Sequence, residues 1–163
     1  MKRALFYTVF AVTAVVIFTA CAVRQTTAQK EAQAVDIRNA VANSEFRFAA
    51  THAHPAGFRS VALSAPFGVR VSPDEVQVHL PFFGRAFRAP MNPSEGGYNF
   101  TSTDFEYSLT PGRRAGNWLV QIVFNDLHSS ITFDFDIWEN GSASLRITDA
   151  SRESISFQGR IEM

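Results

Sequence analysis

Beyond Glu45, apolar and polar side chains alternate along the chain in a series of short runs. A period of two places successive side chains on opposite faces of a strand, which is typical of antiparallel sheets with one buried and one wet face. The alternating runs cover residues 46–48, 76–80, 105–109, 131–137, 145–147 and 155–157. The pattern predicts an antiparallel β domain over residues 45–163.

One stretch breaks this alternation, because residues 118–124 are apolar at nearly every position. A continuous apolar run of this length is typical of a strand that is covered on both faces. The sequence therefore predicts a strand here with a second cover, for which an N-terminal helix is the candidate.

Turn signals separate the predicted strands. Asn140-Gly141 lies between two alternating runs and predicts a type I′ hairpin, in which both central residues take positive φ. Residues 72–74 and 111–116 carry the Pro, Gly and Asp residues that favour turns, and Pro66 interrupts another apolar pair. These signals predict an all-β fold of about eight or nine short strands, mainly an antiparallel meander that closes into a barrel or a sandwich.

Residues 22–44 differ from the predicted β domain, because they are rich in Ala, Gln and Thr. From Ala28 to Val41 the residues favour a helix, and Ala34, Ile37 and Val41 fall on one face of it. The segment 21–44 is therefore interpreted as a tether that becomes a short N-terminal helix and ends at Asn43-Ser44. A partly ordered stalk is the plainer alternative.

The first residues have the layout of a secretory signal, with a basic start at Lys2-Arg3 and an apolar run from Ala4 to Phe18. Thr19-Ala20-Cys21 follows and resembles the lipobox of bacterial lipoproteins, although Phe18 stands where Leu is usual. The resemblance implies a signal peptide over residues 1–20 and a lipid on the Cys21 thiol. Such a lipid would anchor the mature protein to a membrane of the cell envelope, facing the periplasm or the cell surface.

Two alternatives for this segment stay open. Thr26-Thr27-Ala28 offers small residues for cleavage after Ala28, which would release a soluble exported protein. The run from Ala4 to Val23 is also long enough to remain as an uncleaved membrane anchor. In each case the β domain is exported.

The composition indicates what stabilises the domain and which partners it can bind. The chain contains 16 Phe, which supply a large apolar area for a small core, and one Cys, so no intramolecular disulfide can form. Removal of residues 1–20 takes away Lys2 and Arg3 and leaves 13 basic against 15 acidic side chains. This balance provides no electrostatic basis for nucleic-acid binding.

Several short motifs taken together resemble a bacterial family, the domain of unknown function DUF4251. They are Leu80-Pro-Phe-Phe-Gly-Arg-Ala-Phe87 with Gly96-Gly97, then 140–145 and 152–159. The resemblance covers about residues 43–159 and implies an exported lipoprotein with a helical stretch before a β-rich domain. It implies no activity.

The most distinctive candidate site lies in the first of these motifs. On an extended backbone Phe83, Arg85 and Phe87 project to one side, so the guanidinium would sit between two rings or present its fork to a carboxylate or phosphate. The alternative is structural, with the rings in the core and Arg85 paired with Asp134 or Asp136.

Catalytic and metal-binding patterns are weak. His52 and His54 alone do not make a zinc site, which needs three or four ligands, and no nucleophile has a recognisable base beside it. We predict no metal, no cofactor and no catalytic residue. A hydrolase would need His79 or His128 close to Asp134 in a cleft.

The sequence thus predicts a non-enzymatic envelope lipoprotein whose β domain binds a partner protein, an envelope polymer or a small apolar ligand. A lipocalin-like cup is one form of this hypothesis, since barrels of about eight strands can hold a small ligand. An envelope hydrolase and a structural member of a surface complex are the alternatives.

Overall fold

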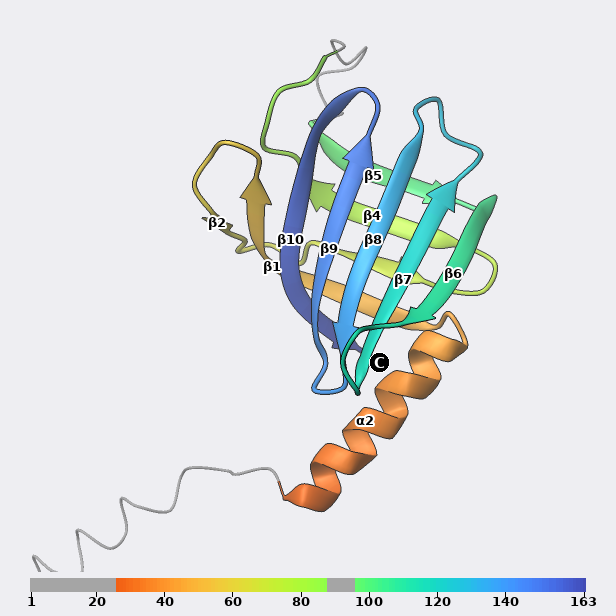
Figure 1. Ribbon diagram of the computed structural model, residues 1–163. Helices are drawn as coiled ribbons and strands as arrows, with labels where there is room; N and C mark the ends of the chain where they lie inside the picture. The colour runs from red at the N-terminus through yellow and green to blue at the C-terminus, as the bar shows by residue number, and fades with distance from the viewer. Residues whose placement is uncertain (1–25, 88–95) are drawn as a thin grey trace, which may run out of the picture. The chain divides into compact units, whose positions relative to one another are not determined.

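The computed structural model describes residues 26–87 and 96–163 (Figure 1). The predicted signal peptide and Cys21 lie outside the described residues. Residues up to Lys30 form a separate unit, and the packing below concerns Glu31–Met163. The elements are α2 (Thr27–Ala42), β1 (Phe46–Pro55), β2 (Val61–Ala62), β3 (Gly68–Val71), β4 (Val76–Pro81), β5 (Gly97–Ser102), β6 (Phe105–Pro111), β7 (Asn117–Phe124), β8 (Ile131–Trp138), β9 (Ser142–Asp149) and β10 (Arg152–Glu162).

The strands form one 10-stranded antiparallel sheet that curls into a nearly closed barrel, which confirms the predicted fold class. The order is β5-β4-β3-β1-β10-β9-β8-β7-β6, and the two-residue β2 pairs with β1. In Figure 1, β6–β10 lie in front and β1, β3, β4 and β5 cross behind them. The two edge strands, β5 and β6, follow each other in the chain without pairing, so the seam of the barrel lies between them.

The sheet bends at β1, which joins its two halves. A side chain on Gly68 would collide with the carbonyl oxygen of Phe48, and one on Gly159 would collide with that of Ala49. These glycines belong to β3 and β10, on either side of β1, and the register of β1 against β10 shifts between Ala50 and His52. Glycine is therefore needed where the backbones approach most closely at the corner of the barrel.

Aromatic rings fill the interior. Phe133 is fully buried, and its ring centroid lies 5.0 Å from that of Phe124 and 6.3 Å from those of Phe100 and Phe135. Phe135 in turn meets the edges of Phe46 and Phe48. Because edge-to-face rings interlock, Phe residues from both halves of the barrel form one continuous core. The inward positions of the predicted alternating runs supply these side chains.

Helix α2 covers one end of the barrel through the buried Ile37 and Val41, two of the three residues that the sequence placed on one face. The Tyr107 hydroxyl on β6 donates a hydrogen bond to the carbonyl of Val41 at 2.7 Å, and burial raises the pKa of Tyr107 to about 12. Gln33 donates to the carbonyl of Asn140 at 3.2 Å. None of the helices among the described residues has the length and apolarity needed to cross a membrane.

The helix ends where the sequence predicted. Ser44 has a positive φ of 55°, and its N–H donates to the carbonyl of Val41, while that of Glu45 donates to Ala40. This pair of bonds is a Schellman motif, which satisfies the last carbonyls and turns the chain into β1.

The prediction that strand 118–124 is covered on both faces is wrong. Val120, Ile122 and Phe124 point into the core, whereas Leu119 on the opposite face is 41% exposed. The helix packs against the end of the barrel, so the outer face of β7 meets solvent. Apolar outward residues produced the false signal.

The hairpin at Asn140-Gly141 forms, but with a different turn from the predicted type I′. Only Gly141 has positive φ, at 79°, and its N–H donates to the carbonyl of Trp138. The loop has three residues between β8 and β9, as in a type I turn followed by a glycine bulge. The Asn140 side chain instead accepts a hydrogen bond from the Ser142 N–H.

The ring packing predicts a large difference between two identical substitutions. Phe133→Ala should lower the free energy of unfolding by about 3–5 kcal/mol, because it leaves a cavity among four rings. Phe58→Ala, at a loop residue that is 62% exposed, should change it by less than about 0.5 kcal/mol. Urea unfolding of both variants measures this, and equal losses would contradict the packing.

Candidate functional site

The structure places Phe83, Arg85 and Phe87 differently from the predicted one-sided row. Strand β4 ends at Pro81, and only Ala86 in the following segment makes an isolated bridge, to Arg152. Phe83 is half-buried against the core, whereas Arg85 is exposed and Phe87 is 67% exposed. Ligand binding by these three side chains remains a prediction.

A cation between two rings does occur, but it belongs to Arg152. Its guanidinium carbon lies 5.2 Å from the ring centroids of both Phe82 and Tyr98, and its Nη1 donates to the carbonyl of Gly97 at 3.2 Å. Its Nε also lies 3.9 Å from the carboxylate of Asp149. The sequence therefore predicted a cation–π contact in this region correctly, but assigned it to Arg85 instead of Arg152.

This arginine cluster is a structural anchor. Asp149 is buried, and its Oδ1 accepts hydrogen bonds from the hydroxyl and N–H of Ser151 and from the hydroxyl of Ser129. Burial, reinforced by the negative charge of Asp149, raises the pKa of Tyr98. The cluster joins the start of β5 to the β9–β10 turn.

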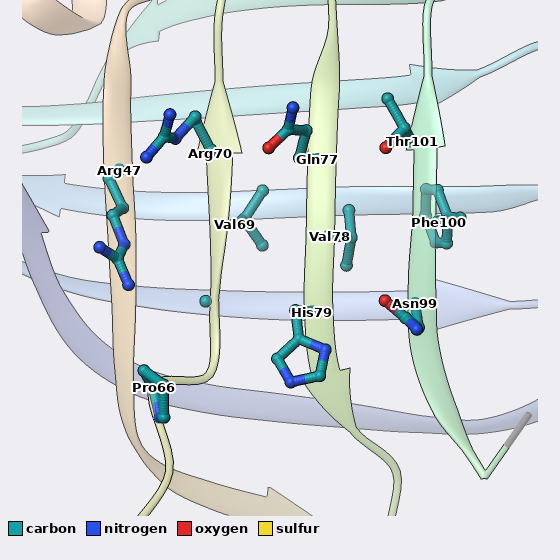
Figure 2. A pocket seen from close by; sticks show the side chains of 11 residues that line it. Arg47, Pro66, Val69, Arg70, Gln77, Val78, His79, Asn99, Phe100 and Thr101 are labelled. Carbon is teal, nitrogen blue, oxygen red and sulfur yellow. The ribbon is translucent and has the colours of Figure 1, made fainter. Parts of the chain in front are cut away.

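A different site lies on the outer face of β1, β3, β4 and β5, where a hollow of about 540 Å³ opens (Figure 2). Two cross-strand rows form it, and we call it the arginine hollow. The first row is Arg47, Arg70, Gln77 and Thr101, and the second is Ala49, Gly68, His79 and Asn99.

The charges in the arginine hollow are unbalanced. Arg47 and Arg70 are directly opposite in the register of β1 and β3, and like charges in that position destabilise a sheet. Arg47 pairs with Glu162 at 3.7 Å, a contact between exposed groups that contributes little. Within the described part of the chain, the Arg70 side chain makes no hydrogen bond and no ion pair. The residues that line the hollow include no carboxylate.

Neutral donors and acceptors line the rest of the arginine hollow, on the neighbouring strands β4 and β5 (Figure 2). Asn99 and Thr101 lie on β5, and His79 stacks on Phe67 with centroids 5.2 Å apart. Guanidinium groups bind carboxylate and phosphate through paired hydrogen bonds, so this arrangement is suited to an anionic group. The sequence held no signal for it, because Arg47 and Arg70 meet only through the pairing of β1 with β3.

The residues that a hydrolase would need are not gathered in one cleft. His79 lines the arginine hollow, Asp134 lines a hollow on β6–β10, and His128 is exposed in the β7–β8 loop. In the described ranges, the His, Cys, Asp and Glu side chains form no group of three that could hold a metal ion.

Asp134 and Asp136 face outward on β8, as their alternation predicted. Gln121 donates to Oδ1 of Asp134 at 2.8 Å, and Asn117 donates to Oδ1 of Asp136. The structural alternative for Arg85 paired it with one of these carboxylates. Both carboxylates instead bind amides of the neighbouring strand β7.

The fold and site define a small antiparallel barrel with a packed aromatic interior and a polar hollow on its outer face. A family model for a domain of unknown function, DUF4251, matches residues 28–161, so the chain belongs to the DUF4251 family and the predicted resemblance is confirmed. A DUF4251 family protein from Bacteroides eggerthii has a similar crystal structure, with a TM-score of 0.59 and 14% identity over 82% of this chain and 91% of that one. This likeness shows a shared fold. No curated protein matches the chain.

Arg152, which lies between two rings, and Arg85, which was predicted to do so, should differ in their effect on stability. Arg152→Met should lower the free energy of unfolding by about 2 kcal/mol, because it leaves the buried Asp149 without its cation. Arg85→Met, at an exposed position, should change it by less than about 0.5 kcal/mol. Thermal unfolding of both variants measures this difference. A larger loss of stability for Arg85→Met than for Arg152→Met would contradict it and would favour a structural role of Arg85.

Proposed function

We propose that this DUF4251 protein is an exported, lipid-anchored binding module of the cell envelope. Its arginine hollow would recognise an anionic group, carboxylate or phosphate, carried by an envelope polymer. The observation that carries the proposal is the opposition of Arg47 and Arg70 across β1 and β3.

The physical reason is the cost of that opposition. Neighbouring strands lie about 4.7–4.9 Å apart, so two guanidinium groups in register repel each other, and the exposed Glu162 on the far side of Arg47 offsets this repulsion only in part. A bound carboxylate or phosphate would accept hydrogen bonds from both and offset the repulsion. Because folding alone gains nothing from this pair, its presence supports a ligand.

The shape of the hollow supports a polymer rather than an enclosed small molecule. It lies on the open face of a sheet, and Thr101, Asn99 and Gln77 extend its polar surface across β4 and β5. The interior of the barrel, where a lipocalin-like carrier holds its ligand, is occupied by the rings around Phe133. Packing therefore favours recognition on the outside.

The anchor is proposed from the sequence of the N-terminal segment. A lipid on Cys21 would leave a tether of a few residues before α2, which caps one end of the barrel through Ile37 and Val41. The helix would then space the domain from the membrane, and the outer faces of the sheet would stay accessible to polymers.

The anchor has a direct test. Cys21→Ser should move the protein from the membrane fraction to the soluble envelope fraction and abolish incorporation of labelled fatty acid, because the acceptor thiol is lost. Ala22→Ser, the matched neighbouring change, should leave both unchanged. If Cys21→Ser stays membrane-bound and labelled, the lipid anchor is excluded.

The binding proposal is tested with the mature chain carrying Cys21→Ser, and with polygalacturonate as a carboxylate polymer and polyphosphate as a phosphate polymer. Arg70→Gln should weaken binding of the recognised polymer at least about tenfold, which is 1.4 kcal/mol. It should also leave stability equal or raise it by up to about 1 kcal/mol, since the repulsion with Arg47 is gone.

Arg146→Gln is the control, because it makes the same change in net charge on the outer face of β9. Calorimetric titration should show that this variant binds as the wild type does. Equal weakening by both variants would mean that only net charge matters, and wild-type affinity in Arg70→Gln would exclude the arginine hollow.

A further inference from the structure

The outer face of the other half of the barrel carries a second depression, on β6–β10. Its floor is formed where β9 presents small outward residues, Ser142 and Ser144, between larger side chains of β8 and β10. In the register, Ser144 lies between Asp136 and Gln158. The short serine side chains thus leave a depression at β9, which we call the serine trough.

Two hollows make up the serine trough, and they share Ser144. One of about 390 Å³ is lined by Trp138, Gln158 and Thr51, and the other, of about 460 Å³, includes Asp134 and Asp136. Together they extend across β6–β10. Five strands about 4.8 Å apart span about 19 Å, which suits a segment of a chain molecule rather than a single small one.

The polar groups of the serine trough can accept and donate several hydrogen bonds. The hydrogen bonds that Gln121 and Asn117 donate to the two carboxylates end on Oδ1. Within residues 26–87 and 96–163, the Oδ2 atoms of Asp134 and Asp136 accept no hydrogen bond. The Ser144 hydroxyl and the Gln158 amide are likewise free in these ranges.

This combination of groups selects a class of ligand. Hydroxyl groups of a sugar donate to carboxylates and both donate to and accept from amides and serines, and the apolar C–H face of a sugar ring packs on an aromatic side chain. Trp138 is the partly exposed aromatic residue at one end of the trough. Arg146 also lines the trough, directly opposite Asp134 in the register of β8 with β9, so the charges of Asp134 and Asp136 are partly balanced and an uncharged ligand is favoured here.

We propose that the serine trough binds a segment of a neutral polysaccharide. The site is independent of the arginine hollow, since the two lie on opposite halves of the sheet and share no residue. The domain would then carry two binding faces of different selectivity, one for anionic groups and one for uncharged sugar chains.

The experiment uses the mature chain with Cys21→Ser and three neutral polysaccharides, laminarin, dextran and mannan. Ser144→Leu fills the floor of the trough at an exposed position, so the fold should be retained. Thr148→Leu is the matched control, because Thr148 is exposed on the same face of β9 and does not line either hollow.

At least one polysaccharide should bind the parent chain and change its tryptophan fluorescence. Ser144→Leu should weaken that binding at least about tenfold. Thr148→Leu and Arg70→Gln should bind normally. Trp138→Phe should remove the fluorescence change, because Trp118 packs against the core instead.

The proposal is overturned if none of the three polysaccharides binds the parent chain, or if Ser144→Leu binds them equally well. Loss of binding only in Arg70→Gln would instead assign these ligands to the arginine hollow.

Discussion

The packing of aromatic rings around Phe133 is the interaction on which the rest of the structure depends. The rings come from both halves of the barrel, because Phe124, Phe133 and Phe135 lie on β7 and β8 while Phe100 lies on β5. No hydrogen bond of the sheet joins β5 to β6 across the seam. Contacts such as that of Phe100 with Phe124 therefore hold the two edges together from inside.

A filled interior places every recognisable binding feature on the outer surface. The outer surface is divided by the bend at β1, and the two halves differ in charge. The hollow on one half presents Arg47 and Arg70 with no carboxylate in its lining, and the hollow on the other presents Asp134 and Asp136 together with Arg146. A different set of charged groups on each face favours different partners for the two faces.

Much of the fold was predictable, because inward and outward side chains differ most clearly where one face of a strand is wet. The run Ile131–Ile137 predicted β8 correctly, and Ile37 and Val41 marked the buried face of α2. The prediction failed where a residue did not follow that contrast. Leu119 is apolar and exposed, so β7 was assigned a cover that it lacks.

The binding faces were less predictable than the fold, because they depend on contacts between strands far apart in the sequence. Arg47 meets Arg70 only in the register of β1 with β3, and Ser144 meets Gln158 only in that of β9 with β10. The motif with Phe83 and Arg85 predicted a cation–π contact, but Arg152, from a distant strand, makes that contact with Phe82. A single sequence reveals periodicity along a strand and hides the neighbours across the sheet.

The central claim is that rings fill the barrel and leave recognition to its outer faces. Titration of the native protein with the apolar fluorophore N-phenyl-1-naphthylamine tests it most directly, because this probe brightens when a dry cavity encloses it. The account predicts no saturable increase in fluorescence. Saturable uptake at one site per native molecule would contradict it and would show that the barrel is an apolar carrier.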